Sequence, residues 1–242
     1  LSLHDALPIS DEQKDFYQAV IITMEAALNY CKRFSLLAKE EAAKTTDAKR
    51  RDELQAMSEM FAHLMEGKAR NFWEAVETVY LTHLLMMIES NGHSFSFGRF
   101  DQYVWPFYEA DINSGKISKE KALEILTHFF IMTNSLNKVR PWGHTQYSGG
   151  YPLYSNLMVG GMKPDGTDGT NDLSYLSLEA MALTGLPEPN LSVRFSKDTP
   201  HSLMQDSAKL IRKGFGMPSI FCDEVVIPAM MTLGLSEEVA RE

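Results

Sequence analysis

The stretch LPEPNLSVRFSKDTP, residues 186–200, indicates the fold class. Within it, Leu191–Phe195 is a short apolar run with turn-forming residues on both sides, which is typical of a strand. Thr199 followed by Pro200 fits a helix N-cap with proline at the first helical position. Two further strand candidates, 157–159 and 219–221, also lie between predicted helices. Short strands that alternate with helices pair in parallel, so the sequence predicts an α/β fold.

The amino-terminal third is predicted to be helical. Ser10 and Gln13 form a capping box, and apolar residues from Phe16 to Cys31 recur at spacings of three and four, which places them on one helical face. Cys31 lies on that face and is interpreted as a small core residue. The predicted helices span residues 11–44, 47–65, 71–89, 119–136, 172–183 and 200–214, and a last one begins at Ser236.

Composition excludes several classes of protein. The 242 residues carry 23 basic and 32 acidic side chains, a net charge of −9, which argues against a nucleic-acid or anionic membrane surface. Two cysteines rule out a disulfide scaffold and suit a reducing cytosol. No apolar run approaches the roughly 20 residues of a membrane helix. A cytoplasmic protein without a bound metal is the expectation.

The block IESNGHSFSFGRFDQYVWPFYEADI, residues 88–112, carries the clearest candidates for a site. His93 and Ser94 follow a helix, and imidazole beside hydroxyl can hydrogen-bond a hydroxylated substrate. A helix C-cap with surface polar groups explains the same residues equally well. Arg99 and Asp101 are interpreted as a buried structural pair.

Other polar residues favour structural roles. His83 falls on an apolar helical stripe and is interpreted as a core histidine. KPDGTDGTND, residues 163–172, lacks the spacing of a calcium loop and is interpreted as a plain surface loop. Common nucleophile, phosphate-loop, dinucleotide and zinc motifs are absent from the sequence.

Several motifs together resemble the glycyl radical enzymes of the pyruvate formate-lyase superfamily, especially the B12-independent glycerol and propanediol dehydratases. After the block above, the resemblance continues in register over nearly all of residues 10–242. The matching segments are ARNFWEAVETVYLTHLLMMIESNG (69–92), SGGYPLYSNLMVGG (148–161), DGTNDLSYLSLEA (168–180), LPEPNLSVRFSKDTP (186–200) and GFGMPSIFCDEVVIPAM (214–230).

The resemblance implies a ten-stranded α/β barrel made of two antiparallel sets of parallel strands. It also implies a protein-based glycyl radical, installed by a radical S-adenosylmethionine activase, and a homodimer when full length. The family's reactive cysteine and radical glycine would lie beyond residue 242, so no catalytic residue is assigned within the chain. Cys222 does not replace that cysteine; it is expected at a strand end, partly buried in a packing role. By analogy, His93, Ser94 and Tyr151 would bind the substrate.

The prediction is therefore a fragment of a lyase that removes water from a small diol. His93, Ser94 and the run Phe100–Tyr103 depart from the pattern of formate C-acetyltransferase, which remains an alternative. Lyases acting on choline, isethionate, hydroxyproline or arylacetates are others, and a non-catalytic truncated paralogue is an alternative of another class. Residues 1–9 resemble a translated sequencing adapter, and residues 10–242 are expected to be a partial domain, inactive alone and cut before the cysteine loop.

Overall fold

The computed structural model describes residues 10–147 and 153–241, and the chain divides into two compact units, residues 1–69 and 70–242. The first unit is a helical hairpin of α1 (Asp11–Lys44) and α2 (Ala48–Leu64). The capping box predicted at Ser10 and Gln13 is confirmed, and Asp47 caps α2 by accepting from the N–H of Arg50. Helix caps were therefore readable from the sequence.

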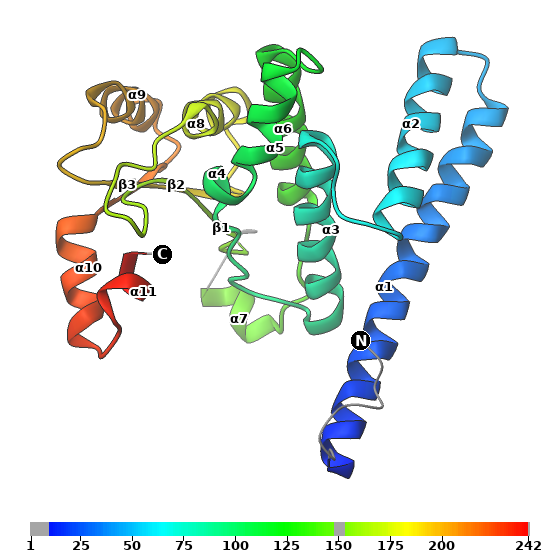
Figure 1. Ribbon diagram of the computed structural model, residues 1–242, viewed down its shortest axis with the longest axis horizontal. Coiled ribbons are helices and arrows are strands. Elements are labelled where there is room, and N and C mark those ends of the chain that lie inside the picture. Colours follow the sequence, from blue (N-terminus) through cyan, green and yellow to red (C-terminus); the bar gives the residue numbers. More distant parts are fainter. Residues whose placement is uncertain (1–9, 148–152, 242) are drawn as a thin grey trace. The chain divides into compact units, whose positions relative to one another are not determined.

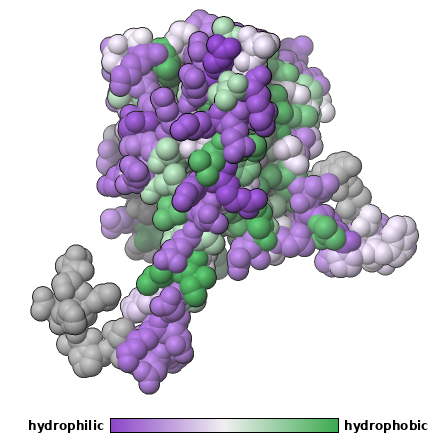
Figure 2. Space-filling model, turned by 90° about the vertical axis from the view of Figure 1, so that its right-hand side faces the viewer, coloured by the Kyte–Doolittle hydropathy of each residue, from purple (hydrophilic) through white to green (hydrophobic). Residues whose placement is uncertain are grey.

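The two helices of this hairpin pack through small residues. Ala38 and Ala42 of α1 lie against Leu54 of α2, and Ser35 and Ser58 each donate to the other's carbonyl at 2.8 Å. Cys31 is buried, as predicted. The rest of the apolar stripe in the first half of α1 is exposed instead, and apolar patches along this helix appear in Figure 2. Periodicity predicted the helix, but the described residues bury only its second half, at Cys31, Ser35, Ala38 and Ala42.

The second unit is built on a parallel sheet. Its strands are β1 (Gly98–Arg99), β2 (Asn156–Gly160), β3 (Asn190–Phe195) and β4 (Ser219–Cys222), hydrogen-bonded in that order. The register pairs Leu157 with Leu191 and Val193 with Ile220. All three strand candidates are confirmed, as is the α/β class with parallel pairing.

Helices surround this sheet. They are α3 (Phe72–Ser90), α4 (Phe100–Tyr103), α5 (Trp105–Asn113), α6 (Lys119–Ser135), α7 (Trp142–Tyr147), α8 (Asp172–Thr184), α9 (His201–Ile211), α10 (Asp223–Thr232) and α11 (Glu237–Arg241). In Figure 1, α8 and α9 lie together on one side of the strands. The core between these two helices and the strands is fully buried and includes Leu157, Leu173, Leu191 and Leu203.

The structure corrects one helix start. Pro200, predicted at the first helical position, is the N-cap residue of α9, and its carbonyl accepts from the N–H of Leu203 at 3.0 Å. The Thr199 hydroxyl does not cap the helix; it accepts from the N–H of Ser196 at 2.8 Å. The predicted cap is displaced by one residue because Thr199 closes the turn after β3 instead.

Candidate functional site

His93 and Ser94 lie at the amino edge of the sheet, meaning the ends at which β1–β3 begin. The segment that carries them runs beside the segment before β2: Ser94 N–H donates to the Leu153 carbonyl and Phe97 N–H to the Asn156 carbonyl, both at 2.7 Å. Both side chains are exposed. The parallel sheet therefore brings together two segments that are about 60 residues apart in the chain.

Backbone strain gathers at this edge. Among the described residues, the non-glycine residues with positive φ are Asn91 (47°), Ser94 (61°) and Tyr154 (57°), and all three belong to these two segments. Asn91 ends α3 in the left-handed conformation. Left-handed backbone costs side-chain-bearing residues about 1–2 kcal/mol each and is concentrated at functional sites. The C-cap of α3 is Asn91, so His93 and Ser94, for which the cap interpretation was made, lie beyond the cap.

The His93 imidazole meets an aromatic side chain. The Tyr154 ring lies edge-on to it, with centroids 5.2 Å apart and planes at 81°. Partial removal of water from the ring, followed by the positive charges of Lys138, Arg140 and His144, lowers the pKa of His93. A neutral imidazole is therefore favoured at neutral pH, with one donor and one acceptor nitrogen available.

A buried carboxylate supports the segment that carries Tyr154. Glu188, just before β3, accepts from Tyr154 N–H at 2.7 Å and from Ser155 N–H at 3.1 Å. Burial raises the pKa of Glu188, and these backbone N–H groups oppose that rise. Neither Glu188 nor Tyr154 was among the residues predicted from the sequence to form a site. An acidic residue between two prolines, directly before an apolar strand, was the available signal for Glu188.

His83 lies behind this edge and is a core histidine, as predicted. It is 4% exposed, its ring contacts Phe97 at 4.4 Å between centroids, and its Nε2 lies 3.2 Å from Ser155 Oγ. Burial lowers the pKa of His83 to about 4. The ring is therefore neutral in the folded protein near pH 7, and its role is structural.

This depressed pKa predicts a pH-dependent stability. Below the ordinary value of about 6.5, the unfolded chain binds a proton that folded His83 does not, so stability falls as the pH drops from about 6.5 towards 4. Relative to a His83→Gln variant, which has no such proton to bind, the wild type should lose about 2 kcal/mol between pH 7.5 and pH 5. Urea unfolding of the full-length protein at both pH values measures this. Parallel losses in both proteins would contradict it.

Tyr151, the third predicted binding residue, lies outside the described residues. Two residues that follow it, Leu153 and Tyr154, make the contacts to Ser94 and His93 described above. The assignment of Tyr151 therefore stays a prediction.

Arg99 and Asp101 lie near the opposite end of the strands, the carboxyl edge. They do not join each other in an ion pair; both hold Gly160. Arg99 Nη2 donates to the Gly160 carbonyl at 3.0 Å, and the Gly160 N–H donates to Asp101 Oδ2 at 2.7 Å. Asp101 is fully buried, and burial raises its pKa to about 6 against the hydrogen bonds from Ser174 and Gly160. The predicted structural role is correct. The two side chains do not pair with each other, however; both hold the last residue of β2.

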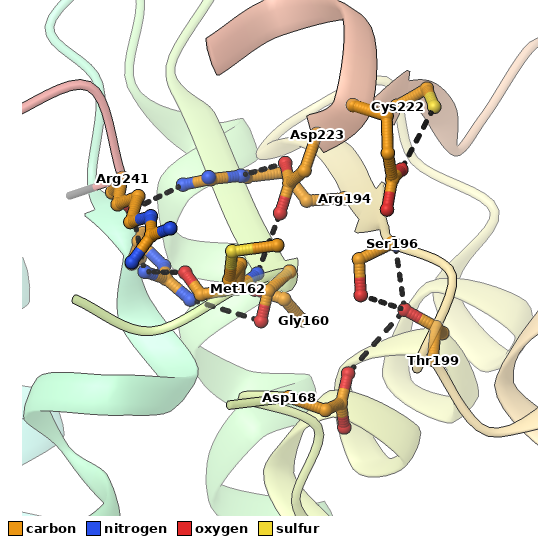
Figure 3. A network of polar contacts seen from close by, with 12 residues as sticks. Gly160, Met162, Asp168, Arg194, Ser196, Thr199, Cys222, Asp223 and Arg241 are labelled. Atoms are coloured by element: carbon orange, nitrogen blue, oxygen red, sulfur yellow. Dashed lines mark hydrogen bonds and ion pairs between the residues drawn. The ribbon is translucent and has the colours of Figure 1, made fainter. Parts of the chain in front are cut away.

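A second set of polar contacts continues along this edge (Figure 3). Arg194 Nε donates to Asp223 Oδ1 at 2.7 Å, and Met162 N–H donates to Asp223 Oδ2 at 2.6 Å. Arg99 and Arg194 each donate from Nη1 to the carbonyl of Arg241, at 3.2 and 3.3 Å. This network ties the ends of β2 and β3 to α10 and α11.

Gly161 makes that network possible. Its φ is +81°, and a Cβ there would lie 2.6 Å from Arg194 Cβ and 3.0 Å from Asp223 Oδ2. Gly161→Ala should lower the free energy of unfolding by about 3 kcal/mol, the sum of backbone strain and overpacking. Gly214, with φ +83° and open space around it, is the matched control, and Gly214→Ala should cost about 1 kcal/mol. Equal losses in urea unfolding would show that packing at Gly161 is not tight.

Cys222 corrects an expectation. It is the last residue of β4, as predicted, but it is exposed, not partly buried, and its Sγ lies 3.3 Å from Glu224 Oε2. The strand end faces away from the core at this position, so packing does not explain the residue.

The described residues contain no group of three or more His, Cys, Asp or Glu side chains placed to hold a metal ion. The loop 163–172 is closed by backbone hydrogen bonds, including Lys163 N–H to the Thr167 carbonyl at 2.8 Å. None of the described helices combines the length and apolar character needed to cross a bilayer.

Comparison with known proteins finds relatives over nearly the whole chain. The chain is 38% identical over 233 residues to the probable dehydratase YbiW of Escherichia coli (strain K12), covering 95% of this chain and 29% of that protein. It is 36% identical over 236 residues to (2S)-3-sulfopropanediol dehydratase of Klebsiella oxytoca, covering 97% and 29%. The glycerol-bound B12-independent glycerol dehydratase of Clostridium butyricum matches in structure with a TM-score of 0.93 and 41% identity, covering 99% of this chain and 30% of that one.

The chain thus spans about 30% of the length of these relatives. The family model described as pyruvate formate lyase-like matches residues 2–242. The chain therefore belongs to the pyruvate formate lyase-like family, and its relatives include glycyl radical dehydratases.

Proposed function

We propose that this chain is the substrate-orienting part of a glycyl radical dehydratase that removes water from a small hydroxylated substrate. The observation that carries the proposal is the amino edge of the sheet. There, His93 and Ser94 are exposed, and the left-handed non-glycine residues Asn91, Ser94 and Tyr154 lie in the two segments that meet at this edge. Strained backbone persists where the surrounding structure over-determines it, and such positions cluster at binding sites.

The chemistry of the two side chains fits a diol. A neutral imidazole supplies one donor and one acceptor, and a hydroxyl supplies both. His93 and Ser94 can therefore bind adjacent substrate hydroxyls, and Tyr151 would help to wall the pocket. When present, the family's protein-based radical would supply the hydrogen abstraction. Loss of water then converts a 1,2-diol into an aldehyde. The departing hydroxyl takes up a proton to leave as water, and His93 would hydrogen-bond this hydroxyl and pass the proton to it.

The wider assignment rests on family membership. We propose that residues 10–242 are part of a larger pyruvate formate lyase domain whose complete form is a ten-stranded barrel, to which the observed four parallel strands contribute. The reactive cysteine and the radical glycine would lie outside residues 1–242. A radical S-adenosylmethionine activase and a second copy of the chain are the proposed partners, and the cytoplasm is the proposed location.

A substrate panel tests this function. The full-length protein, purified without oxygen and activated, should convert glycerol or 1,2-propanediol to the corresponding aldehyde. Isethionate, hydroxyproline, choline, an arylacetate and pyruvate with coenzyme A are the competing substrates. Turnover of pyruvate to formate, or of no hydroxylated substrate in a protein that forms the radical, would overturn the proposal.

A further inference from the structure

Glu188 is buried, and no cation among the described residues pairs with it. It is 2% exposed, and no ion pair joins it to another described residue. A carboxylate in such a position is costly unless hydrogen bonds replace its water. Here the replacement is the backbone N–H groups of Tyr154 and Ser155, at 2.7 and 3.1 Å. The cost of burying this charge is therefore coupled to the conformation of one short segment, residues 153–155.

That segment has the conformation that the candidate site requires. Tyr154 has φ +57°, which a side-chain-bearing residue adopts only when its neighbours hold it there. Glu188 holds its N–H, and the Leu153 carbonyl on the other side accepts from Ser94 N–H at 2.7 Å. The Tyr154 ring thereby reaches the His93 imidazole, and the contact is edge-on.

We propose that Glu188 and Tyr154 are positioning residues for the His93–Ser94 site. The Glu188 carboxylate locks the segment 153–155, and Tyr154, carried by that segment, fixes the plane of the His93 ring. This inference rests on the proposed function of His93 and Ser94. Neither residue needs to touch the substrate, because each acts through the geometry of His93.

Two variants separate this role from simple stabilisation. Glu188→Gln keeps the shape of the side chain but turns an amide N–H₂ towards one backbone N–H, which releases the segment. Tyr154→Gly keeps the left-handed backbone, which glycine adopts freely, and removes the whole side chain with its ring. Tyr154 is 44% exposed, so Tyr154→Gly should fold even if Glu188→Gln does not. Tyr154→Phe retains the ring edge and is the conservative variant.

Steady-state kinetics of the activated full-length protein with 1,2-propanediol is the measurement. Glu188→Gln and Tyr154→Gly should each raise KM about tenfold and change kcat less than twofold. The reason is that a misoriented His93 ring weakens substrate binding, while His93 itself is still present for the reaction. Tyr154→Phe should match the wild type. In a His93→Ala background, neither variant should raise KM further, since both act through His93.

Asp111→Asn is the matched control. Asp111 is also a buried carboxylate that accepts from a backbone N–H, that of Phe72 at 2.8 Å, at the far end of α3. The Asp111→Asn variant should lower the unfolding midpoint and leave KM unchanged. Unchanged KM in Tyr154→Gly, or effects that add to those of His93→Ala, would overturn this inference and leave the proposed function standing. Unchanged kcat/KM in His93→Ala itself would overturn the proposed function and the inference with it.

Discussion

Asp223→Ala is expected to lower the free energy of unfolding of the full-length protein by about 3–5 kcal/mol. The Asp223 side chain is fully buried and the Arg194 side chain is 7% exposed, with 2.7 Å between Oδ1 and Nε. Removing the carboxylate leaves a guanidinium in the interior without its anion. It also removes the acceptor of the Met162 N–H. Breaking a buried pair from one side costs more than the pair contributes, because the remaining charge stays desolvated.

An exposed pair of the same length is the control for this prediction. Lys209 and Asp206 are 2.7 Å apart on the surface of α9. Since water screens such pairs, Lys209→Ala should change the free energy of unfolding by less than about 1 kcal/mol. The urea midpoints of both variants and the wild type give the comparison. A loss below about 1 kcal/mol for Asp223→Ala would mean that the interior relaxes to admit water around Arg194.

His93→Ala is expected to reduce kcat/KM for the diol about 100-fold or more, while the free energy of unfolding changes by less than about 0.5 kcal/mol. A positioned group that exchanges a proton or a strong hydrogen bond with a reacting hydroxyl contributes about 10²–10⁴-fold to rate. The ring is exposed, and its edge contact with Tyr154 is its only aromatic contact among the described residues, so little packing is lost.

Two controls sharpen the interpretation of His93→Ala. His201, an exposed histidine at the start of α9, should tolerate alanine with no change in kcat/KM. Ser94→Gly keeps the left-handed backbone at φ +61° and removes the whole side chain, Cβ and hydroxyl together, so its effect reports the side chain without backbone strain. Equal relative losses of activity and stability in His93→Ala would assign His93 a structural role.

The sequence was most informative where local chemistry decides the structure. Ser10, Asp47 and Asn71 each cap the helix predicted after them, because a side-chain oxygen satisfies a backbone N–H two or three residues ahead. Three of the four described strands, β2, β3 and β4, were found because they are short apolar runs between helices. The short helices α4, α5 and α7 were not predicted, since four to nine residues are too few to show a helical period.

Helix α10 was missed for another reason. Pro228 lies inside it, and proline normally argues against a helix interior. Tertiary packing overrides that preference here, with Ile227 and Asp223 buried.

The site shows the same division between local and long-range information. His93 and Ser94 were chosen as candidates because they are adjacent polar residues after a helix. Tyr154 and Glu188 were not, because Tyr154 reaches His93 and Glu188 reaches Tyr154 only through the register that aligns β1, β2 and β3. No pattern within one segment of the sequence specifies that register.

The five residues of β2 separate the two edges of the sheet by roughly 13 Å. Strained segments with His93 and Ser94 lie at one edge, and the arginine–aspartate contacts that fix the strand ends lie at the other. Under the proposed function, substitutions that alter which molecule is recognised could accumulate at the amino edge without disturbing the contacts that hold the strands. The proposal thus makes residues 91–94 and 153–155 the place to begin redesigning specificity.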